Sequence, residues 1–237
     1  GYTRRLDKDC YVDFDRIFAV SDETAGVLAG VYPECQQKLS VFHNLIDTEA
    51  IRQKALLPAE KSMHEGIRLL TVGRLTPQKG FDCAVYALKL LLEKQYPVYW
   101  YIIGEGPEYG RLTQLARSLH VEDHFIFLGM QTNPYPYFKM ADFYIHATRF
   151  EGKSIAIQEA QVLGCAIAAS DCSGNREQIV SGVDGLLCPF SPEGIANAVE
   201  YLIEHPQTAQ SFGRAAAQKA CHFENDIHMI RDLLYSP

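Results

Sequence analysis

The chain has 237 residues, of which 47% are hydrophobic, 11% aromatic and 22% charged. This mixture is typical of a globular protein and excludes a disordered or fibrous chain. The 22 basic and 29 acidic residues give a net charge of −7, which argues against extensive binding to the phosphate backbone of a nucleic acid. The longest apolar runs have the length of strands, so we expect no membrane-spanning helix.

Cysteine usage and the first residues bear on the cellular compartment. The seven cysteines are odd in number and scattered, without a C-x-x-C pair, a pattern typical of reduced thiols in a cytoplasmic protein. Residues 1–5 are polar and lead into no hydrophobic stretch, so they do not resemble a secretory signal. We therefore expect a cytoplasmic protein.

The first 50 residues predict too few elements to form a domain of their own. Residues 16–20 and 40–43 are expected strands, and Ser21 is expected to cap a helix between them. Two strands and a helix cannot close a core alone, so we expect residues 1–50 to be the remnant of an upstream domain. Residues 51–65 are polar, contain a proline and are expected to form a linker.

From residue 66 onward, apolar runs alternate with amphipathic helical patterns. The apolar runs predict strands at residues 67–72, 98–103, 125–128, 143–146, 166–169 and 186–188. The other segments predict helices at residues 81–92, 109–119, 135–140, 154–163, 176–180, 193–204, 207–220 and 224–234. This alternation indicates an α/β fold with a Rossmann-like, doubly wound parallel sheet over residues 66–237.

In such a sheet the ligand lies at the carboxyl ends of the strands, on the loops that follow them. Arg74 and Lys79 lie in the loop after the first strand, and Gly152 precedes a helix expected to begin near Ser154. Two cations and a helix N-terminus suit a diphosphate. Glu159 lies roughly 7.5 Å further along that helix, where a carboxylate can accept hydrogen bonds from the hydroxyls of an attached ribose.

Two common nucleotide-binding motifs and a metal site are not predicted. Gly104 and Gly106 would need a third glycine to complete G-x-G-x-x-G, but that position holds Tyr109. The sequence contains no G-x-x-x-x-G-K-[ST] run. No His, Cys or Asp residues have metal-ligand spacing, so we expect neither a metal nor another cofactor.

Three motifs together resemble the donor-binding domain of glycosyltransferase family 4. They are Gly73-Arg74-Leu75 with Lys79-Gly80, Gly104-Glu105-Gly106-Pro107, and a pair of glutamates, Glu151 and Glu159, in the pattern E-x7-E. The family consists of retaining, nucleotide-sugar-dependent enzymes of the GT-B architecture. The resemblance covers nearly the whole chain and implies that residues 66–237 are the C-terminal, donor-binding half of a GT-B fold.

The resemblance also implies a role for each matching residue. Arg74 and Lys79 would bind the diphosphate and stabilise the charge that grows on it as it leaves. Glu151 would hold hydroxyls of the transferred sugar near the reacting carbon, and Glu159 would hold the ribose. The other implied substrate-binding residues, which approach the phosphates, the sugar or the base, are Gly73, Gly104, Met130, Gly152, Lys153, Ser154 and Ile155. Of these, Ser154 and Ile155 would cap the phosphates with backbone amides, and Met130 would line the base.

A sequence variant and a histidine near the paired glutamates also bear on the site. Many family members have Gly-Phe-Gly after the first glutamate, whereas this chain has Gly152-Lys153-Ser154. That variant is similar to bacterial enzymes that build capsule, lipopolysaccharide or exopolysaccharide. His146 ends the fourth predicted strand close to the site, and a lone histidine there is typically packed or hydrogen-bonded rather than a ligand.

The implied function is transfer of a hexose from a UDP- or GDP-sugar to a glycan or lipid-linked acceptor. Residues 1–50 resemble the last segment of the N-terminal acceptor domain, and residues 224–234 resemble the helix that packs back on that domain. We therefore expect this chain to be inactive alone. The sequence leaves open the identity of the base, the sugar and the acceptor. It also leaves open whether the full-length protein associates peripherally with the inner face of the cell membrane. The alternatives are a GT-B sugar-nucleotide 2-epimerase and a degenerate nucleotide-binding module.

Overall fold

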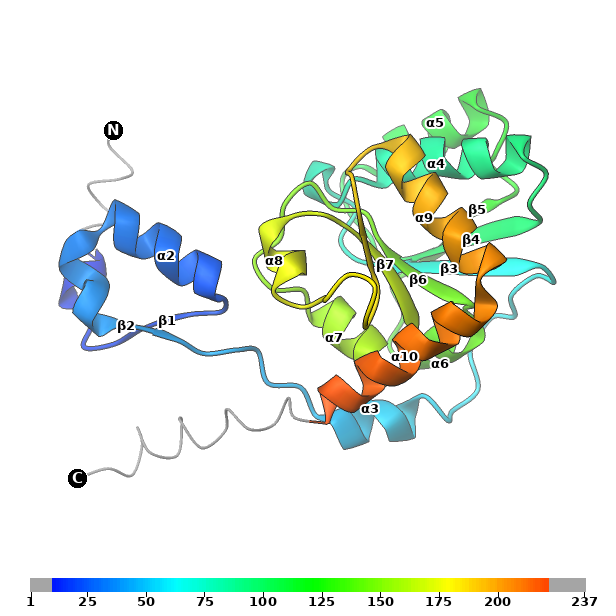
Figure 1. Cartoon of the computed structure of the whole chain (residues 1–237). Coiled ribbons are helices and arrows are strands. Elements are labelled where there is room, and N and C mark those ends of the chain that lie inside the picture. Colours follow the sequence, from blue (N-terminus) through cyan, green and yellow to red (C-terminus); the bar gives the residue numbers. More distant parts are fainter. Residues whose placement is uncertain (1–9, 222–237) are drawn as a thin grey trace. The chain divides into compact units, whose positions relative to one another are not determined.

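The computed structural model describes residues 10–221, which form two compact units, residues 10–45 and residues 46–221 (Figure 1). All seven cysteines lie in this range and are free thiols, as the sequence predicted. No helix within the described range is long and apolar enough to cross a membrane.

The smaller unit contains a two-stranded parallel sheet and the helix α2 (Asp22–Val31). Its strands β1 (Ile17–Ala19) and β2 (Leu39–Val41) pair in register, with Ile17 opposite Leu39. Helix α2 begins after Ser21, whose side chain accepts a hydrogen bond from the amide of Thr24, so the predicted cap is confirmed. The short helix η1 (Pro33–Lys38) leads into β2.

The larger unit begins with a helix that the sequence did not predict. Helix α3 (Thr48–Lys54) lies within the segment read as remnant and linker, and Asp47 caps it by accepting from the amide of Ala50 at 2.7 Å. The helix is short and mostly polar, and among its own residues only Thr48 and Ile51 are buried. Ile51 packs in a small cluster with Ile46, Val162 and Ala220, so tertiary packing rather than a periodic pattern specifies this helix.

A six-stranded parallel sheet forms the centre of the larger unit (Figure 1). Its strands are β3 (Ile67–Val72), β4 (Val98–Ile103), β5 (Phe125–Gly129), β6 (Phe143–His146), β7 (Ala166–Ser170) and β8 (Leu186–Cys188). Their order across the sheet is β5-β4-β3-β6-β7-β8, which is the order of a Rossmann-type doubly wound sheet. The predicted fold class is confirmed, and β5 and β7 each extend one residue beyond the predicted end.

Helices cover both faces of this sheet. One buried cluster joins it to α4 (Phe81–Glu93), α5 (Tyr109–Ser118) and α9 (Pro192–Glu204), and the other joins it to α6 (Tyr135–Met140) and α7 (Ile155–Val162). Leu69 and Leu70 are both fully buried, because successive side chains of a strand point to opposite faces and each face has its own helices. Helix α10 (Pro206–Ala220) packs against β7 and α7.

Two helical predictions differ from the structure or lie beyond it. Helix α8 (Ser173–Arg176) begins before the predicted range of 176–180, because the amides of Asn175 and Arg176 both bond to the carbonyl of Cys172. The predicted helix at residues 224–234 lies outside the described residues.

Candidate functional site

The predicted site residues lie at the carboxyl edge of the sheet, where β3 and β6 are neighbours. The strand order runs outward from this pair in both directions, and such a switch point is where doubly wound sheets bind their ligands. The loop after β3 and the loop after β6 are joined there by hydrogen bonds. The amide of Arg149 and the hydroxyl of Thr148 both donate to the carbonyl of Gln78, at 2.9 and 3.1 Å.

At this edge Lys79 and Glu151 form an ion pair. The Lys79 ammonium donates to Oε2 of Glu151, and the two side chains are only 19% and 12% exposed. The methylene groups of Lys79 pass close to Gly73, where an added Cβ would lie 3.7 Å from Cδ of the lysine. The structure thus brings together two of the three residues expected to be catalytic. The third, Arg74, is exposed, and its guanidinium has no hydrogen-bond or ion-pair partner within residues 10–221.

His146, the last residue of β6, contacts the same carboxylate. Its Nε2 lies 3.3 Å from Oε2 of Glu151, and its Nδ1 lies 3.3 Å from the hydroxyl of Tyr144. Because an ionised carboxylate only accepts hydrogen bonds, Nε2 carries the proton. The phenol of Tyr144 also lies 3.5 Å from the carbonyl oxygen of Val72, to which it donates. The imidazole is 2% exposed. The expectation that this histidine is packed and hydrogen-bonded is confirmed, and its partner is Glu151 itself.

The two contacts on Glu151 determine its charge state. Burial is the largest influence on this carboxyl and disfavours its charged form, but the hydrogen bonds from His146 and Lys79 together outweigh burial and lower its pKa to about 2. For His146, burial has the opposite effect and lowers the pKa, because the charged form of an imidazole is the protonated one. The positive charge of Lys79 acts in the same direction. At neutral pH the cluster therefore contains an ammonium, a carboxylate and a neutral imidazole.

The lowered pKa of Glu151 predicts a contribution to stability that depends on pH. The folded pKa of about 2 lies below the ordinary value of 4.5, so the contribution is present above pH 4.5 and is lost as the pH falls toward the folded value. We expect the gap in unfolding free energy between wild type and Glu151→Gln to shrink by about 2 kcal/mol from about pH 6 to pH 3. Urea unfolding followed by circular dichroism measures it, and a gap that is constant over this range would contradict the prediction.

The glycines of the Gly104-Glu105-Gly106-Pro107 motif allow the neighbouring loop to approach closely. An added Cβ at Gly104 (φ +142°) would lie 2.0 Å from the carbonyl oxygen of Gly73, and one at Gly106 (φ +158°) would lie 2.4 Å from that of Leu75. The amide of Leu75 donates to the carbonyl of Glu105 at 2.8 Å. Gly104 and Gly73, both predicted to bind the substrate, thus lie backbone to backbone and hold the loop that carries Lys79.

The residues that hold the second loop were not predicted from the sequence. Gly174 of α8 lies against it, so that an added Cβ would be 2.2 Å from the carbonyl oxygen of Glu151 and 2.3 Å from that of Gly152. Gln178 is 3% exposed and clamps Ser154, accepting from its amide at 2.7 Å and donating to its carbonyl at 2.9 Å. A glutamine in a polar stretch gives no sequence signal of such a role.

The hydrogen bonds with Gln178 affect one of the two backbone amides that are predicted to cap the phosphates. Ser154 caps helix α7, because its hydroxyl accepts from the amide of Ile157 at 3.4 Å, but its own amide is engaged by Gln178. Ile155 is 48% exposed, and its amide has no acceptor within the described part of the chain. The amide of Ile155 is therefore the available one. Gly152 and Lys153 are half-buried in the same loop.

Glu159 lies on α7 and is half-buried, as a residue that accepts from a ligand would be. Its Oε1 accepts from the phenol of Tyr135 at 3.0 Å. Burial raises the pKa of Glu159, and the bond from Tyr135 opposes that effect. Burial and the charge of Glu159 raise the pKa of Tyr135 to about 12, so the phenol stays protonated. A cavity of about 230 Å³ beside them is lined by Ile46, Asp47, Ala50, Ile51, Lys54, Tyr135 and Glu159.

A larger cavity of about 510 Å³ lies at the carboxyl ends of β4 and β5. It is lined by Gly104, Glu105, Gly106, Tyr109, Phe127, Leu128 and Gly129. The rings of Tyr109 and Phe127 meet edge to face at 5.1 Å. Met130, which we expect to line the base, follows this cavity directly, is 69% exposed and donates its amide to Glu105 at 3.4 Å.

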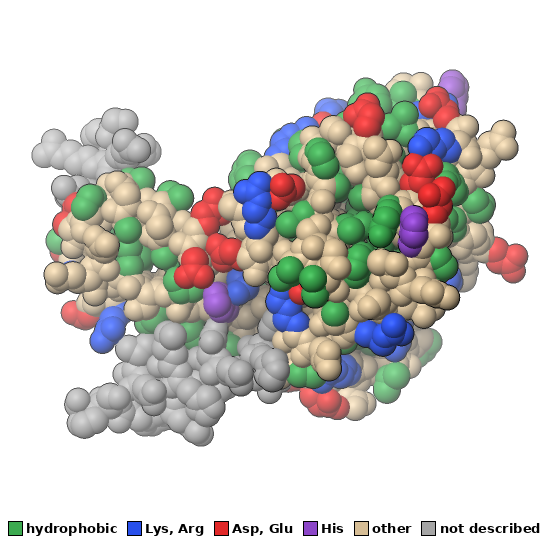
Figure 2. Space-filling view, in the orientation of Figure 1, with side chains coloured by type: hydrophobic (Ala, Val, Ile, Leu, Met, Phe, Trp, Pro, Cys, Tyr) green, Lys and Arg blue, Asp and Glu red, His purple; other side chains and the backbone are tan. Residues whose placement is uncertain are grey.

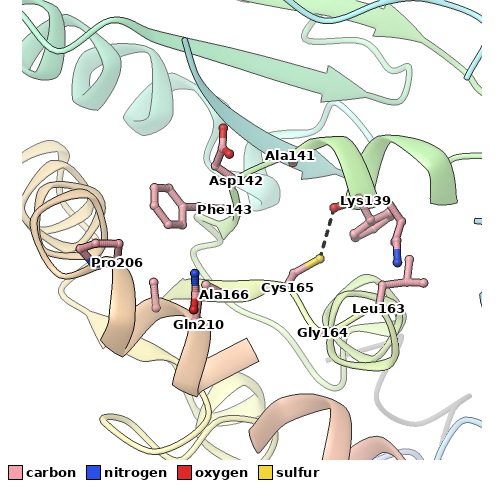
Figure 3. Close-up of a pocket in the computed structure, with 12 residues that line it drawn as sticks. Lys139, Ala141, Asp142, Phe143, Leu163, Gly164, Cys165, Ala166, Pro206 and Gln210 are labelled. Carbon is pink, nitrogen blue, oxygen red and sulfur yellow. Dashed lines mark hydrogen bonds between the residues drawn. The ribbon is translucent and has the colours of Figure 1, made fainter. Parts of the chain in front are cut away.

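A third cavity, of about 410 Å³, opens at the opposite edge of the sheet (Figure 3). Its walls include the first residues of β6 and β7, with Lys139, Asp142 and Gln210 around them. It contains none of the predicted site residues.

Within residues 10–221 no group of three or more His, Cys, Asp and Glu side chains could hold a metal ion. Figure 2 shows acidic and basic side chains interspersed over the visible face of the larger unit.

Comparison with known proteins decides the family of this chain. The sequence model of the family described as "Glycosyl transferases group 1" matches residues 52–219, which include Lys79, Glu151 and Glu159. The chain belongs to this family. The group 1 glycosyltransferase domain covers almost the whole larger unit and begins within helix α3.

Two relatives of this glycosyltransferase chain act in bacterial glycan assembly according to their names. It is 30% identical over 200 residues to N-acetylgalactosamine-N,N'-diacetylbacillosaminyl-diphospho-undecaprenol 4-alpha-N-acetylgalactosaminyltransferase of Campylobacter jejuni, with 84% of this chain and 53% of the relative covered. It is 28% identical over 175 residues to the amylovoran biosynthesis glycosyltransferase AmsK of Erwinia amylovora, with 70% and 41% covered. The chain spans about half the length of the curated relatives it matches.

The glycosyltransferase chain is also similar in structure to HepE of Anabaena, which was crystallised in complex with UDP-glucose. The TM-score is 0.84 at 19% identity, and the match covers 100% of this chain and 68% of HepE. At this identity the likeness shows the fold alone, which is the C-terminal portion of a GT-B glycosyltransferase.

Proposed function

We propose that this chain is the sugar-donor-binding part of a retaining glycosyltransferase that transfers a hexose from a UDP- or GDP-sugar to a glycan or lipid-linked acceptor. The observation that carries the proposal is the half-buried Lys79–Glu151 pair at the switch point of the sheet, in a chain of the group 1 family. It combines a cation for a diphosphate with a carboxylate for sugar hydroxyls.

Each predicted residue has a defined task in this proposal. Lys79 and Arg74 bind the diphosphate, and Lys79 stabilises the negative charge that develops on the leaving group. Glu151 accepts hydrogen bonds from hydroxyls of the transferred sugar, and Glu159 accepts from the ribose. The amide of Ile155 binds a phosphate oxygen at the start of α7. The cavity lined by Gly129 and Tyr109 takes the base, with Met130 at its rim.

The acceptor is proposed from the relatives and from the length of the chain. The name of the Campylobacter jejuni relative contains sugars linked to diphospho-undecaprenol, and the name of the Erwinia amylovora relative refers to amylovoran biosynthesis. The chain spans about half of its relatives. We propose that the acceptor site lies in a further N-terminal domain, to which residues 10–45 contribute. On this proposal the chain alone binds the sugar nucleotide but transfers sugar poorly or not at all.

Substitution of Glu159 tests the donor site. We expect one of UDP and GDP to bind the chain in calorimetry, with EDTA leaving the affinity unchanged and with ADP and NAD failing to bind. Glu159→Ala should weaken that affinity by about tenfold or more, because hydrogen bonds from the ribose to a carboxylate are lost. The matched control is Glu122→Ala, an exposed carboxylate before β5, which should leave binding unchanged.

Three results would count against the proposal or a part of it. If no nucleoside diphosphate binds the full-length protein, this edge of the sheet is not a sugar-nucleotide site. If the full-length protein epimerises a free sugar nucleotide without any acceptor, the reaction is that of a GT-B sugar-nucleotide 2-epimerase instead. Transfer by residues 1–237 alone would show that the acceptor site is already present in this chain.

A further inference from the structure

We propose that His146 is a positioning residue that keeps the Glu151 carboxylate in place once a sugar donor occupies Lys79. This inference rests on the proposed function and adds a residue for which the family motifs assign no role. The geometry that supports it is the shared oxygen of Glu151: both Nζ of Lys79 and Nε2 of His146 contact Oε2, and both residues are largely buried.

The contacts of Glu151 are divided unevenly between its two oxygens. Oε2 receives the hydrogen bonds from Lys79 and His146, whereas Oε1 has no partner within residues 10–221. When a diphosphate binds Lys79, the ammonium donates hydrogen bonds to the phosphate and interacts less with Glu151. The bond from His146 then remains on Oε2 and holds the carboxylate, so that Oε1 faces the sugar hydroxyls as an acceptor.

The surroundings of His146 favour a neutral, fixed imidazole. The titratable or charged groups that face it are Tyr144 on its own strand, Glu151 on the following loop and Lys79 on the loop after β3. Tyr144 is fully buried, and its phenol donates to the carbonyl of Val72 at 3.5 Å and lies 3.3 Å from Nδ1. The carboxylate of Glu151 is thus the contact that places the ring proton on Nε2. A neutral donor can hold the carboxylate without attracting the phosphate that belongs on Lys79.

The tautomer of His146 tests the pairing without any ligand. Long-range ¹H–¹⁵N spectra of the chain with ¹⁵N-labelled histidine distinguish a ring protonated at Nε2, at Nδ1 or at both. We expect the Nε2–H tautomer at neutral pH in the wild type and a mixture of tautomers in Glu151→Ala. A Nδ1–H tautomer, a doubly protonated ring at neutral pH, or a spectrum unchanged by Glu151→Ala would overturn the inference.

Two substitutions test the consequence for the sugar in the full-length protein. His146→Leu removes the N–H donor, while His146→Gln keeps an N–H at a similar reach. The affinity for the sugar nucleotide is compared with that for the matching nucleoside diphosphate. We expect His146→Leu to lower the affinity for the sugar nucleotide about tenfold and to change the affinity for the nucleoside diphosphate less than about twofold. His146→Gln should recover most of the lost affinity for the sugar nucleotide.

A merely structural role would give a different result. Equal losses for both ligands, or no recovery in His146→Gln, would overturn the inference, and thermal unfolding shows whether each variant is folded. If the wild-type full-length protein binds no sugar nucleotide, the proposed function fails, and with it the role of His146 in sugar binding; the tautomer measurement then decides only whether His146 holds Glu151.

Discussion

Lys79→Ala in the full-length protein is expected to lower kcat/KM for sugar transfer by on the order of 10²–10³, with most of the loss in kcat. The ammonium lies in a partly buried position beside Glu151, where a fixed charge stabilises a developing negative charge more strongly than it would in water. On the proposed mechanism the ammonium assists the departing diphosphate most in the transition state, so its loss is expected to affect the chemical step more than donor binding. Steady-state kinetics with the sugar nucleotide identified by calorimetry measure both parameters.

The matched control for this substitution is Lys139→Ala. Lys139 is an exposed lysine at the cavity on the opposite edge of the sheet, so its removal changes the net charge equally without touching the site. We expect the control to keep wild-type kinetics. A value of kcat/KM for Lys79→Ala within about twofold of the control would remove Lys79 from the mechanism.

Gly174→Ala is expected to move the Glu151 loop and to lower transfer by on the order of 10², because a misplacement of about 1 Å costs that much when reacting groups are held in place. The added methyl would lie 2.2 Å from one backbone carbonyl oxygen and 2.3 Å from the next, so backbone has to shift. Overpacking of this kind also lowers the free energy of unfolding by about 1–3 kcal/mol. Transfer kinetics and urea unfolding of the same variant measure the two effects.

Gly110→Ala is the control for Gly174→Ala. Gly110 lies in α5, and an added Cβ there meets nothing within 4 Å. This variant should be as stable as the wild type or slightly more stable, since alanine favours a helix over glycine, and its kinetics should be unchanged. Wild-type activity in Gly174→Ala would mean that the loop tolerates displacement and that the position of Glu151 is not set by α8.

The sheet and the central pair could be predicted because both follow from strong local patterns. Parallel strands that are covered on both faces read as continuous apolar runs, as in residues 98–103, where Trp100 and Ile102 are fully buried. The carboxyl ends of such strands share one edge, so Lys79 after β3 and Glu151 after β6 were expected to lie near each other. The ion pair between them confirms that proximity; their roles in binding and catalysis stay predictions.

The unpredicted parts depend on contacts between segments far apart in the sequence. Helix α3 has too few buried residues for a helical pattern and is specified by packing against α7. Gln178 acts through both backbone groups of Ser154, 24 positions away, and any polar residue in that stretch would look the same in the sequence. The partner of His146 depends on the path of a loop, which no periodicity encodes.

The Lys79–Glu151 pair also means that the proposed diphosphate site carries its own counterion. An incoming anion has to replace a carboxylate that is tethered next to the lysine and is therefore present at a high effective concentration. A simple phosphate gains only the contact with the lysine in that exchange. A ligand that also brings hydroxyl groups can bind the released carboxylate in turn, so that both former partners are satisfied. On this proposal, selection against the abundant small anions of a cell comes from this exchange of partners.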